Sequence, residues 1–156
     1  MTPNWKNIKQ FCAEEVARQY GTTDEAFVEK PTAWMIAAWS FAIEEFESGS
    51  LLSSDLITRF GYFIEPNKNY GGFRCCPVMV GIAKPPDWRH VHRLMSQLFT
   101  LDNLNEMTPE EIYLEFEKIH PFRDGNGRTG KIIYNWCLNS LDDPQMPPNF
   151  FGCSNP

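Results

Sequence analysis

The residues best suited to chemistry in this chain lie in one short stretch, from His120 to Lys131. The stretch reads His-Pro-Phe-Arg-Asp-Gly-Asn-Gly-Arg-Thr-Gly-Lys. Its glycines permit backbone angles at which several amide N–H groups converge, and a helix that begins directly after them adds free N–H groups and a positive dipole. With the full charges of Arg128 and Lys131, these groups predict a site for a polyphosphate.

Two further side chains give this stretch reactive character. The carboxylate of Asp124 is a natural ligand for the magnesium ion that accompanies a polyphosphate. The imidazole of His120 titrates near neutral pH and is suited to take a proton from a hydroxyl group. Each feature alone has an ordinary explanation as a helix cap or a turn. Their combination at this spacing favours a functional site.

A P-loop is the main rival interpretation, because residues 125–131 match Gly-x-x-x-x-Gly-Lys. A P-loop needs a Ser or Thr next, where this chain has Ile132, and it needs a buried strand before its first glycine. The residues before this loop instead form the end of a capped helix, so we reject the P-loop.

The apolar pattern predicts a mainly α fold that positions this loop. Helices are expected over residues 5–20, from Pro31 to about 48, and over 54–63, 87–101, 109–119 and 128–141. The helix from Pro31 is apolar on nearly all sides, which is typical of a buried central helix. A capping box at Thr108 starts the helix that ends at His120, where the following proline disfavours helical geometry. Valines alternating along residues 73–82 predict a short β-hairpin.

Composition limits the class of protein. The chain has 156 residues, 20 acidic and 14 basic, and a net charge of −6. An acidic protein argues against a broad nucleic-acid surface, whereas a local excess of bases over residues 120–131 suits a small anion such as a nucleotide. No stretch suggests a signal peptide or a membrane span, and the five cysteines form no Cys-x-x-Cys pair. We therefore expect a cytoplasmic protein with free thiols, no zinc site and no membrane or nucleic-acid partner.

Residues 120–128 resemble the motif of the Fic (Fic/Doc) family, His-x-Phe-x-Asp/Glu-Gly-Asn-Gly-Arg, without a mismatch. Phe73-Arg74, Pro77-Val78-x-Val80 and Pro85-Pro86 resemble that family's flap region. The resemblance covers about residues 51–141 and implies one Fic domain over 1–156, ending in an extended tail at 142–156. It implies a Fic-fold helical bundle with a β-hairpin flap beside the active-site loop.

The activity that this resemblance implies is transfer of AMP from Mg²⁺-ATP to a Ser, Thr or Tyr hydroxyl of a target protein. His120 would be the general base, and Asp124 would bind Mg²⁺. The remaining nucleotide-binding residues would be Gly125, Asn126, Gly127, Arg128, Lys131 and Asn135. The flap residues Phe73, Arg74, Val78 and Val80 would dock the target backbone as an added strand.

Two features depart from the family pattern. Lys131 stands where a second arginine is usual, and lysine keeps the charge but loses the bidentate fork. Relatives with a built-in inhibitor carry Ser/Thr-x-x-x-Glu, whose glutamate pairs with that arginine, and the candidate here is Ser40 to Glu44. The alternative is that these residues belong to an ordinary buried helix with an acidic end. In that case the enzyme is uninhibited or a separate antitoxin supplies the glutamate.

Several functions remain open from the sequence. The resemblance implies that the same fold could also perform UMP transfer, kinase chemistry or removal of AMP. Phosphorylating Doc-like relatives replace the first glycine of the motif, so the presence of Gly125 favours nucleotidyl transfer over kinase chemistry. A catalytically weak nucleotide-binding interaction module is the alternative from another class, and Lys131 is the feature that favours it. A role as toxin, effector or regulator is consistent with each of them.

Overall fold

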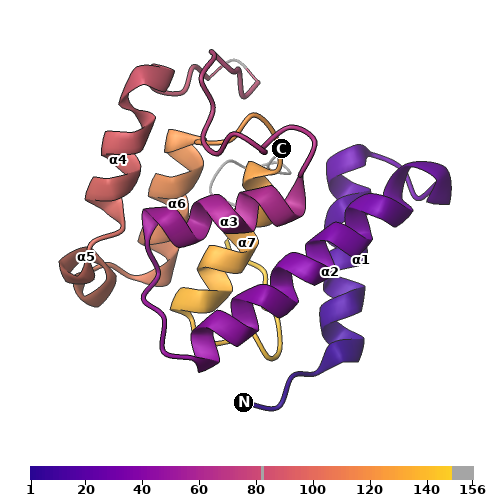
Figure 1. Ribbon diagram of the computed structural model, residues 1–156. Helices are drawn as coiled ribbons and strands as arrows, with labels where there is room; N and C mark the ends of the chain where they lie inside the picture. Colours follow the sequence, from indigo (N-terminus) through magenta and orange to yellow (C-terminus); the bar gives the residue numbers. More distant parts are fainter. Residues whose placement is uncertain (82, 149–156) are drawn as a thin grey trace.

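A computed structural model describes residues 1–81 and 83–148, and these residues form seven α-helices and one turn of 3₁₀ helix. The elements are α1 (Trp5–Tyr20), α2 (Glu25–Glu47), α3 (Ser54–Ile64), the 3₁₀ turn (Trp88–His90), α4 (Val91–Leu98), α5 (Leu101–Glu106), α6 (Pro109–Ile119) and α7 (Asn126–Cys137). In Figure 1, α1 and α2 lie on one side of α7, and α4, α5 and α6 lie on the other. The prediction of a mainly helical bundle is confirmed.

The central helix of the bundle is α7, which contacts α1, α2, α3 and α6. All of its residues from Asn126 to Trp136 are buried. The sequence placed the central helix at Pro31 instead, and that prediction was wrong: in α2, Trp39 is fully buried whereas Trp34 is only half-buried. Gly130 explains why α7 packs so closely, because a side chain at this position would overlap the carboxylate of Glu117 on α6.

Local capping signals set most helix ends. The two reciprocal bonds of the capping box between Thr108 and Glu111 are both present at the start of α6. Helix α2 begins at Glu25, earlier than expected, because the side chain of Asp24 accepts the amide of Ala26. Pro31 therefore lies inside that helix.

Two further helix predictions need correction. The helix expected over residues 87–101 is divided, because α4 ends before Phe99 and the side chain of Thr100 caps a separate helix, α5. Helix α7 begins at Asn126 and ends at Cys137, so it is displaced toward the loop relative to the expected residues 128–141.

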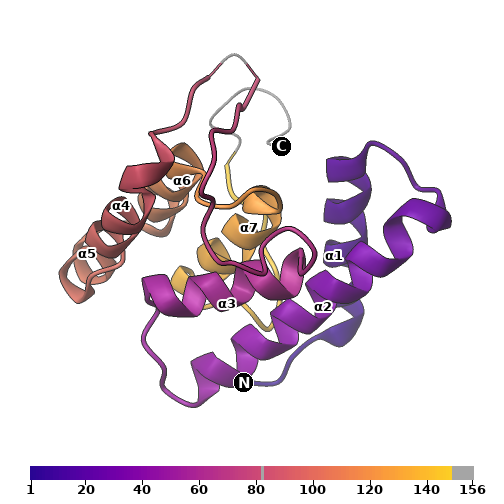
Figure 2. The same cartoon turned by 45° about the horizontal axis from the view of Figure 1, so that its top comes forward.

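The predicted β-hairpin is wrong for the described part of the chain. No strand forms in residues 1–81 and 83–148, and the flap region has only an isolated antiparallel bridge between Val80 and Ala83. A hairpin needs two runs of residues with free N–H groups, and Pro77, Pro85 and Pro86 lack them. Figure 2 shows this segment rising away from the helices before it returns to α4.

The segment before α1 and the segment directly after α7 are bonded to one another and to α2. The amide of Asn4 donates to the carbonyl of Asp142 at 2.8 Å, and the indole N–H of Trp39 donates to the carbonyl of Leu141 at 2.8 Å. The tail over residues 142–148 is non-helical, as predicted. Phe150 and Phe151, which we expected to anchor it, lie outside the described residues.

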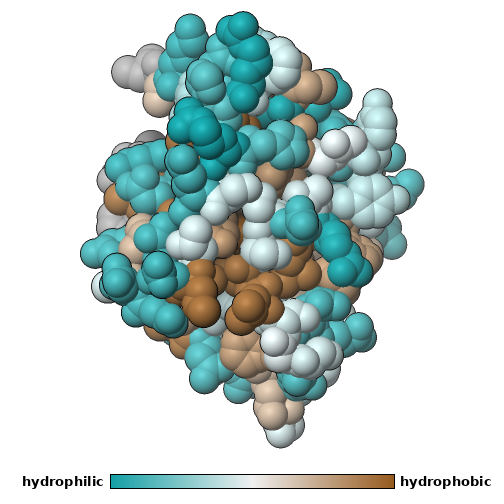
Figure 3. All heavy atoms as spheres, turned by 60° about the vertical axis from the view of Figure 1, so that its left-hand side comes forward, coloured by the Kyte–Doolittle hydropathy of each residue, from teal (hydrophilic) through white to brown (hydrophobic). Residues whose placement is uncertain are grey.

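The face that carries α4 and α5 has an apolar area (Figure 3). Apolar side chains reach the surface there as a group surrounded by polar ones (Figure 3). Leu101, the first residue of α5, is exposed. None of the helices in the described residues is long and apolar enough to cross a membrane.

Candidate active site

The loop between α6 and α7 is held in shape by its own side chains. Helix α6 ends at His120, whose left-handed backbone (φ 51°, ψ 62°) turns the chain out of the helix. The side chain of Asn126 then closes the loop: its Oδ1 accepts the amide of Phe122 at 2.8 Å, and its Nδ2 donates to the carbonyl of Phe122 at 2.9 Å. All these groups are buried, so the loop is fixed before any ligand binds.

Phe122 anchors this loop in the core. Its ring is fully buried and lies 5.3 Å from the ring of Phe73, measured between centroids. The other side of the ring covers Gly61 on α3, where any side chain would overlap Phe122. Glycine at position 61 is therefore part of what positions the loop.

His120 lies in an environment that keeps its imidazole neutral. The residue is 9% exposed. Burial, reinforced by the nearby positive charge of Arg74, lowers the pKa of His120 to about 4, and the carbonyl of Glu117 only partly offsets this. At neutral pH the ring thus carries a free lone pair, which is the state that a general base requires.

Arg74 binds backbone carbonyls at the end of α6 and the start of the loop. Its Nε donates to the carbonyl of His120 at 2.8 Å, and Nη2 donates to the carbonyls of Pro86 at 2.6 Å and Ile119 at 3.3 Å. Its backbone amide donates to the carbonyl of Pro121 at 2.8 Å. Arg74 therefore joins the end of α6 to the flap segment.

The flap residues divide into two pairs. Phe73 and Arg74 are buried, a position that supports the loop and does not favour their predicted role in target docking. Val78 and Val80 are half-buried on the outer part of the segment. Only this second pair keeps a position suited to the predicted docking role.

Helix α7 begins without a side-chain cap, because its N-cap is Gly125. Gly125 has a φ of 79°, and a side chain there would press on Ile64. Its amide donates to Oδ1 of Asp124 at 2.8 Å. The first turn of α7 begins with Asn126 and Gly127, and its N–H groups give this end of the helix a positive potential for an anion.

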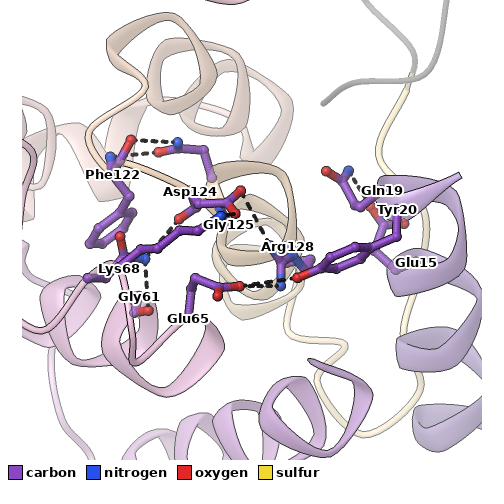
Figure 4. A network of polar contacts seen from close by, with 12 residues as sticks. Glu15, Gln19, Tyr20, Gly61, Glu65, Lys68, Phe122, Asp124, Gly125 and Arg128 are labelled. Carbon is purple, nitrogen blue, oxygen red and sulfur yellow. Dashed lines mark hydrogen bonds and ion pairs between the residues drawn. The ribbon is translucent and has the colours of Figure 1, made fainter. Parts of the chain in front are cut away.

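Arg128 lies in the first turn of α7 and is only 2% exposed. Its Nη1 is 3.4 Å from Oε2 of Glu65, and its Nη2 is 3.6 Å from Oδ1 of Asp124. The ring of Tyr20, from the end of α1, lies 5.5 Å from the guanidinium carbon (Figure 4). Within the described residues Nε has no hydrogen-bond partner. The guanidinium therefore retains capacity to bind an anion.

Asp124 is half-buried beside Arg128, with Lys68 on its other side. Its Oδ2 accepts a bond of 2.8 Å from the Lys68 ammonium, and its carbonyl accepts one of 2.8 Å from Nδ2 of Asn69. Burial alone would raise the pKa of Asp124, but Lys68, Arg128 and the Gly125 amide together hold it below its usual range. The carboxylate is thus ionised and already pairs with a cation, so it is suited to serve as a metal ligand.

The metal would depend on substrate oxygens for most of its ligands. No group of three or more His, Cys, Asp or Glu side chains that could hold a metal ion occurs in the part of the chain that the structure describes. Mg²⁺ is commonly held by one or two carboxylates together with phosphate oxygens and water. Asp124 beside the start of α7 matches that arrangement.

Lys131 points away from the loop, into a buried cluster between α1, α6 and α7. Its Nζ lies 3.1 Å from Oε1 of Glu15 and 3.3 Å from the hydroxyl of Tyr113. Burial alone would lower the pKa of Lys131, but these neighbours and Glu117 raise it above its usual range. Burial raises the pKa of Glu117 to about 7, and the charge of Glu15 adds to this while Lys131 opposes it.

Besides Lys131, three predicted residues are not brought to the loop. Asn135 is fully buried and fixes the tail, accepting the amide of Gln145 at 2.7 Å and donating to its carbonyl at 3.0 Å. Ser40 is half-buried and Glu44 exposed near the end of α2. In the described residues, the acidic partner of Lys131 is Glu15, and those of Arg128 are Glu65 and Asp124. The inhibitory assignment of Glu44 therefore has no structural support.

Four side chains at or near the site were missed from the sequence. They are Glu15, Tyr20, Glu65 and Lys68. The last two lie on a polar turn directly after the amphipathic helix α3, which is a weak composition signal. The first two are separated from the loop by more than a hundred residues, and no sequence pattern links them to it.

The chain is similar to known proteins in both sequence and fold. Residues 52–138, more than half of the chain, match the Fic/DOC family. Among solved structures, the crystal structure of IbpAFic2 covalently tethered to Cdc42 is similar, with a TM-score of 0.66 and 15% identity over 92% of this chain. The present chain covers 50% of that protein chain. With the His120–Arg128 loop at the start of the central helix, these matches establish that the chain belongs to the Fic/DOC family.

Proposed function

We propose that this protein transfers AMP from Mg²⁺-ATP to a hydroxyl group of a target protein. One observation carries the proposal: a buried, neutral imidazole at the end of α6 and an uncapped helix start with a buried arginine are joined by a rigid loop of five residues, 121–125. The imidazole can accept a proton, and the helix start can bind phosphates. Nucleotidyl transfer to a hydroxyl needs both.

The proposed step involves one proton and one phosphoryl centre. His120 removes the proton of the target hydroxyl as its oxygen attacks the α-phosphorus of ATP. The bond from that phosphorus to the bridging oxygen breaks, and pyrophosphate leaves. Amides of Asn126 and Gly127 and the guanidinium of Arg128 stabilise the charge on the phosphate oxygens. Mg²⁺ bound at Asp124 would neutralise part of the charge of the triphosphate.

A protein target is supported by the structural neighbour, which was crystallised tethered to the protein Cdc42. We place target docking on the outer segment at Val78 and Val80, which lies next to the loop through the bonds of Arg74. A separate antitoxin remains part of the proposal. Its glutamate would have to displace Glu15 from Lys131, because that lysine is already paired.

ATP labelled on either the α or the γ phosphate tests this function. Purified protein, Mg²⁺ and each labelled ATP are incubated with a cell lysate, with His120→Ala as the matched control. We expect protein-bound label from the α position only, and its loss in the control. Label from the γ position would mean kinase chemistry and would overturn the assignment. If ATP gives no label from either position, repeating the assay with the other three nucleotides tests UMP transfer and related reactions.

A second candidate, a nucleotide-binding module without transfer activity, is favoured by the position of Lys131. This residue stands where the family has a second phosphate-binding arginine, yet its ammonium is held by Glu15 and Tyr113. The substitution Lys131→Arg separates the two candidates. A strong rise in transfer identifies a transferase limited by its lysine. Nucleotide binding without transfer in either protein supports the binding module.

A further inference from the structure

The turn after α3 supplies the loop with a pair of opposite charges. Lys68 places its ammonium 2.8 Å from Oδ2 of Asp124, and Glu65 places its carboxylate 3.4 Å from Nη1 of Arg128. A metal–phosphate ligand would present the same two charges, a cation to the aspartate and an anion to the arginine. Figure 4 shows Lys68, Asp124, Glu65 and Arg128 grouped at the loop.

Exposure distinguishes the two pairs. The side chains of Arg128 and Glu65 are 2% and 5% exposed, whereas those of Lys68 and Asp124 are 54% and 36% exposed. A buried pair is costly to separate, because either partner would be left as an uncompensated charge. An exposed pair contributes little, and a lysine on its flexible stem can return to water. Only the contact of Lys68 is therefore readily exchangeable.

The aspartate is held independently of the lysine. Asn69 donates to the carbonyl of Asp124 at 2.8 Å and to the carbonyl of Gly61 at 3.0 Å, so the backbone at Asp124 is tied to α3. The amide of Gly125 also binds Oδ1 of the carboxylate. When Lys68 leaves, Asp124 keeps these contacts, and Oδ2 becomes free for another cation.

We propose that Lys68 is a built-in competitor of the divalent cation: it balances Asp124 in the free protein and is replaced when the metal binds. Lys68 is then a positioning residue that sets the metal affinity of the site and touches no reacting atom. This inference rests on the proposed function, because it deepens the metal site of that reaction. It leads to an unusual expectation, that removing a charged side chain from the site tightens binding of the metal.

The alternative role for an exposed lysine at this place is direct contact with a phosphate of the nucleotide. The two roles predict opposite effects. A phosphate contact contributes to nucleotide affinity and has no unfavourable effect on metal binding. A competitor weakens metal binding even when no nucleotide is present and the metal is held by Asp124 and water, so the metal alone distinguishes the two roles.

The experiment measures binding of Mn²⁺, used as a spectroscopic substitute for Mg²⁺, by electron paramagnetic resonance without nucleotide. The proteins are the wild type, Lys68→Met, and each of them with Asp124→Asn to define binding at this site. Lys118→Met is the matched control, since Lys118 is also an exposed lysine paired with a carboxylate, Glu115. We expect Lys68→Met to tighten the Asp124-dependent binding about fivefold, from loss of the ion pair and of like-charge repulsion. The control should not change it.

Unchanged or weaker Mn²⁺ binding in Lys68→Met, or a gain that persists with Asp124→Asn, would overturn the inference. Lys68→Gln and the thermal midpoint of each variant guard against a folding defect. A second titration with ATP in the presence of EDTA tests the phosphate role, and weaker ATP binding there, with unchanged Mn²⁺ binding, assigns Lys68 to the nucleotide. The Mn²⁺ measurement needs no transfer activity. Its result therefore tests the role of Lys68 separately from the proposed transfer reaction.

Discussion

The loop from His120 to Arg128 and the flap segment from Cys75 to Pro86 are neighbours, but they are held in different ways. Most of the loop is buried, and backbone groups of Phe122 and His120 are bonded to the side chains of Asn126 and Arg74. The described part of the flap segment is mostly exposed and has one isolated bridge. Under the proposed function, the difference means that phosphate binding would be built into the core, whereas the surface proposed to face the target would be open to change.

The largest loss of stability is expected from Asn126→Ala, a substitution in the buried part of the loop. The substitution leaves the amide and carbonyl of Phe122 buried without partners, and each unpaired buried group costs about 1–3 kcal/mol. We expect the free energy of unfolding to fall by about 2–4 kcal/mol in chemical denaturation. Asn67→Ala, at an exposed position, is the control. A loss below about 1 kcal/mol would show that the loop does not depend on this side chain.

The second prediction concerns the glycine beneath Phe122. A methyl group at Gly61 would overlap the Phe122 ring, whereas a methyl group at Gly71 would meet open space. Overpacking a core typically costs about 1–3 kcal/mol, so we expect Gly61→Ala to destabilise the protein by about 2 kcal/mol and Gly71→Ala to be near neutral. Equal thermal midpoints for the two variants would argue that the loop relaxes freely.

The third prediction uses the titration of the buried cluster beneath α7. Burial raises the pKa of Glu117 to about 7, so folding favours its protonated form, and this contribution to stability is lost as pH rises from about 4.5 through 7. Relative to wild type, Glu117→Gln should therefore gain about 2 kcal/mol of stability between pH 5 and pH 8. Glu115→Gln, on the exposed side of the same helix, should track the wild type. A constant difference between Glu117→Gln and wild type would contradict the assigned pKa.

The smallest stability effect is expected in the flap segment. Val78→Ala combined with Val80→Ala should change the free energy of unfolding by less than about 0.5 kcal/mol, because both side chains are only half-buried on a segment with few contacts. Under the proposal, the same variant should lose most transfer of label to the target while its ATP affinity is unchanged. Full transfer by a stable double variant would remove the docking role from these residues.

Local signals in the sequence predicted the parts of the fold that local forces determine. The capping box at Thr108 and the proline after His120 located α6 and its end. The spacing from His120 to Arg128 indicated the candidate site, because a loop that joins two helices keeps its residues together. These interactions operate within a few residues, which is why the sequence reveals them.

The rest depends on contacts between distant parts of the chain. Four side chains reach the loop or its helix from α1 and from the turn after α3: Glu15, Tyr20, Glu65 and Lys68. Contacts of this kind between distant residues leave no periodic pattern in the sequence. The hairpin prediction failed for a related reason. Alternating valines describe a strand only when a partner strand exists, and the neighbouring prolines exclude one.

The central claim is that the start of α7 is a preformed polyphosphate site. It is tested most directly by backbone amide NMR of ¹⁵N-labelled protein titrated with Mg²⁺-ATP. The account predicts that the largest chemical-shift changes occur at the amides of Asn126, Gly127 and Arg128, and that they persist in His120→Ala, because the histidine acts on the hydroxyl and not on ATP. Changes confined to other parts of the chain, or none at saturating nucleotide, would contradict the claim.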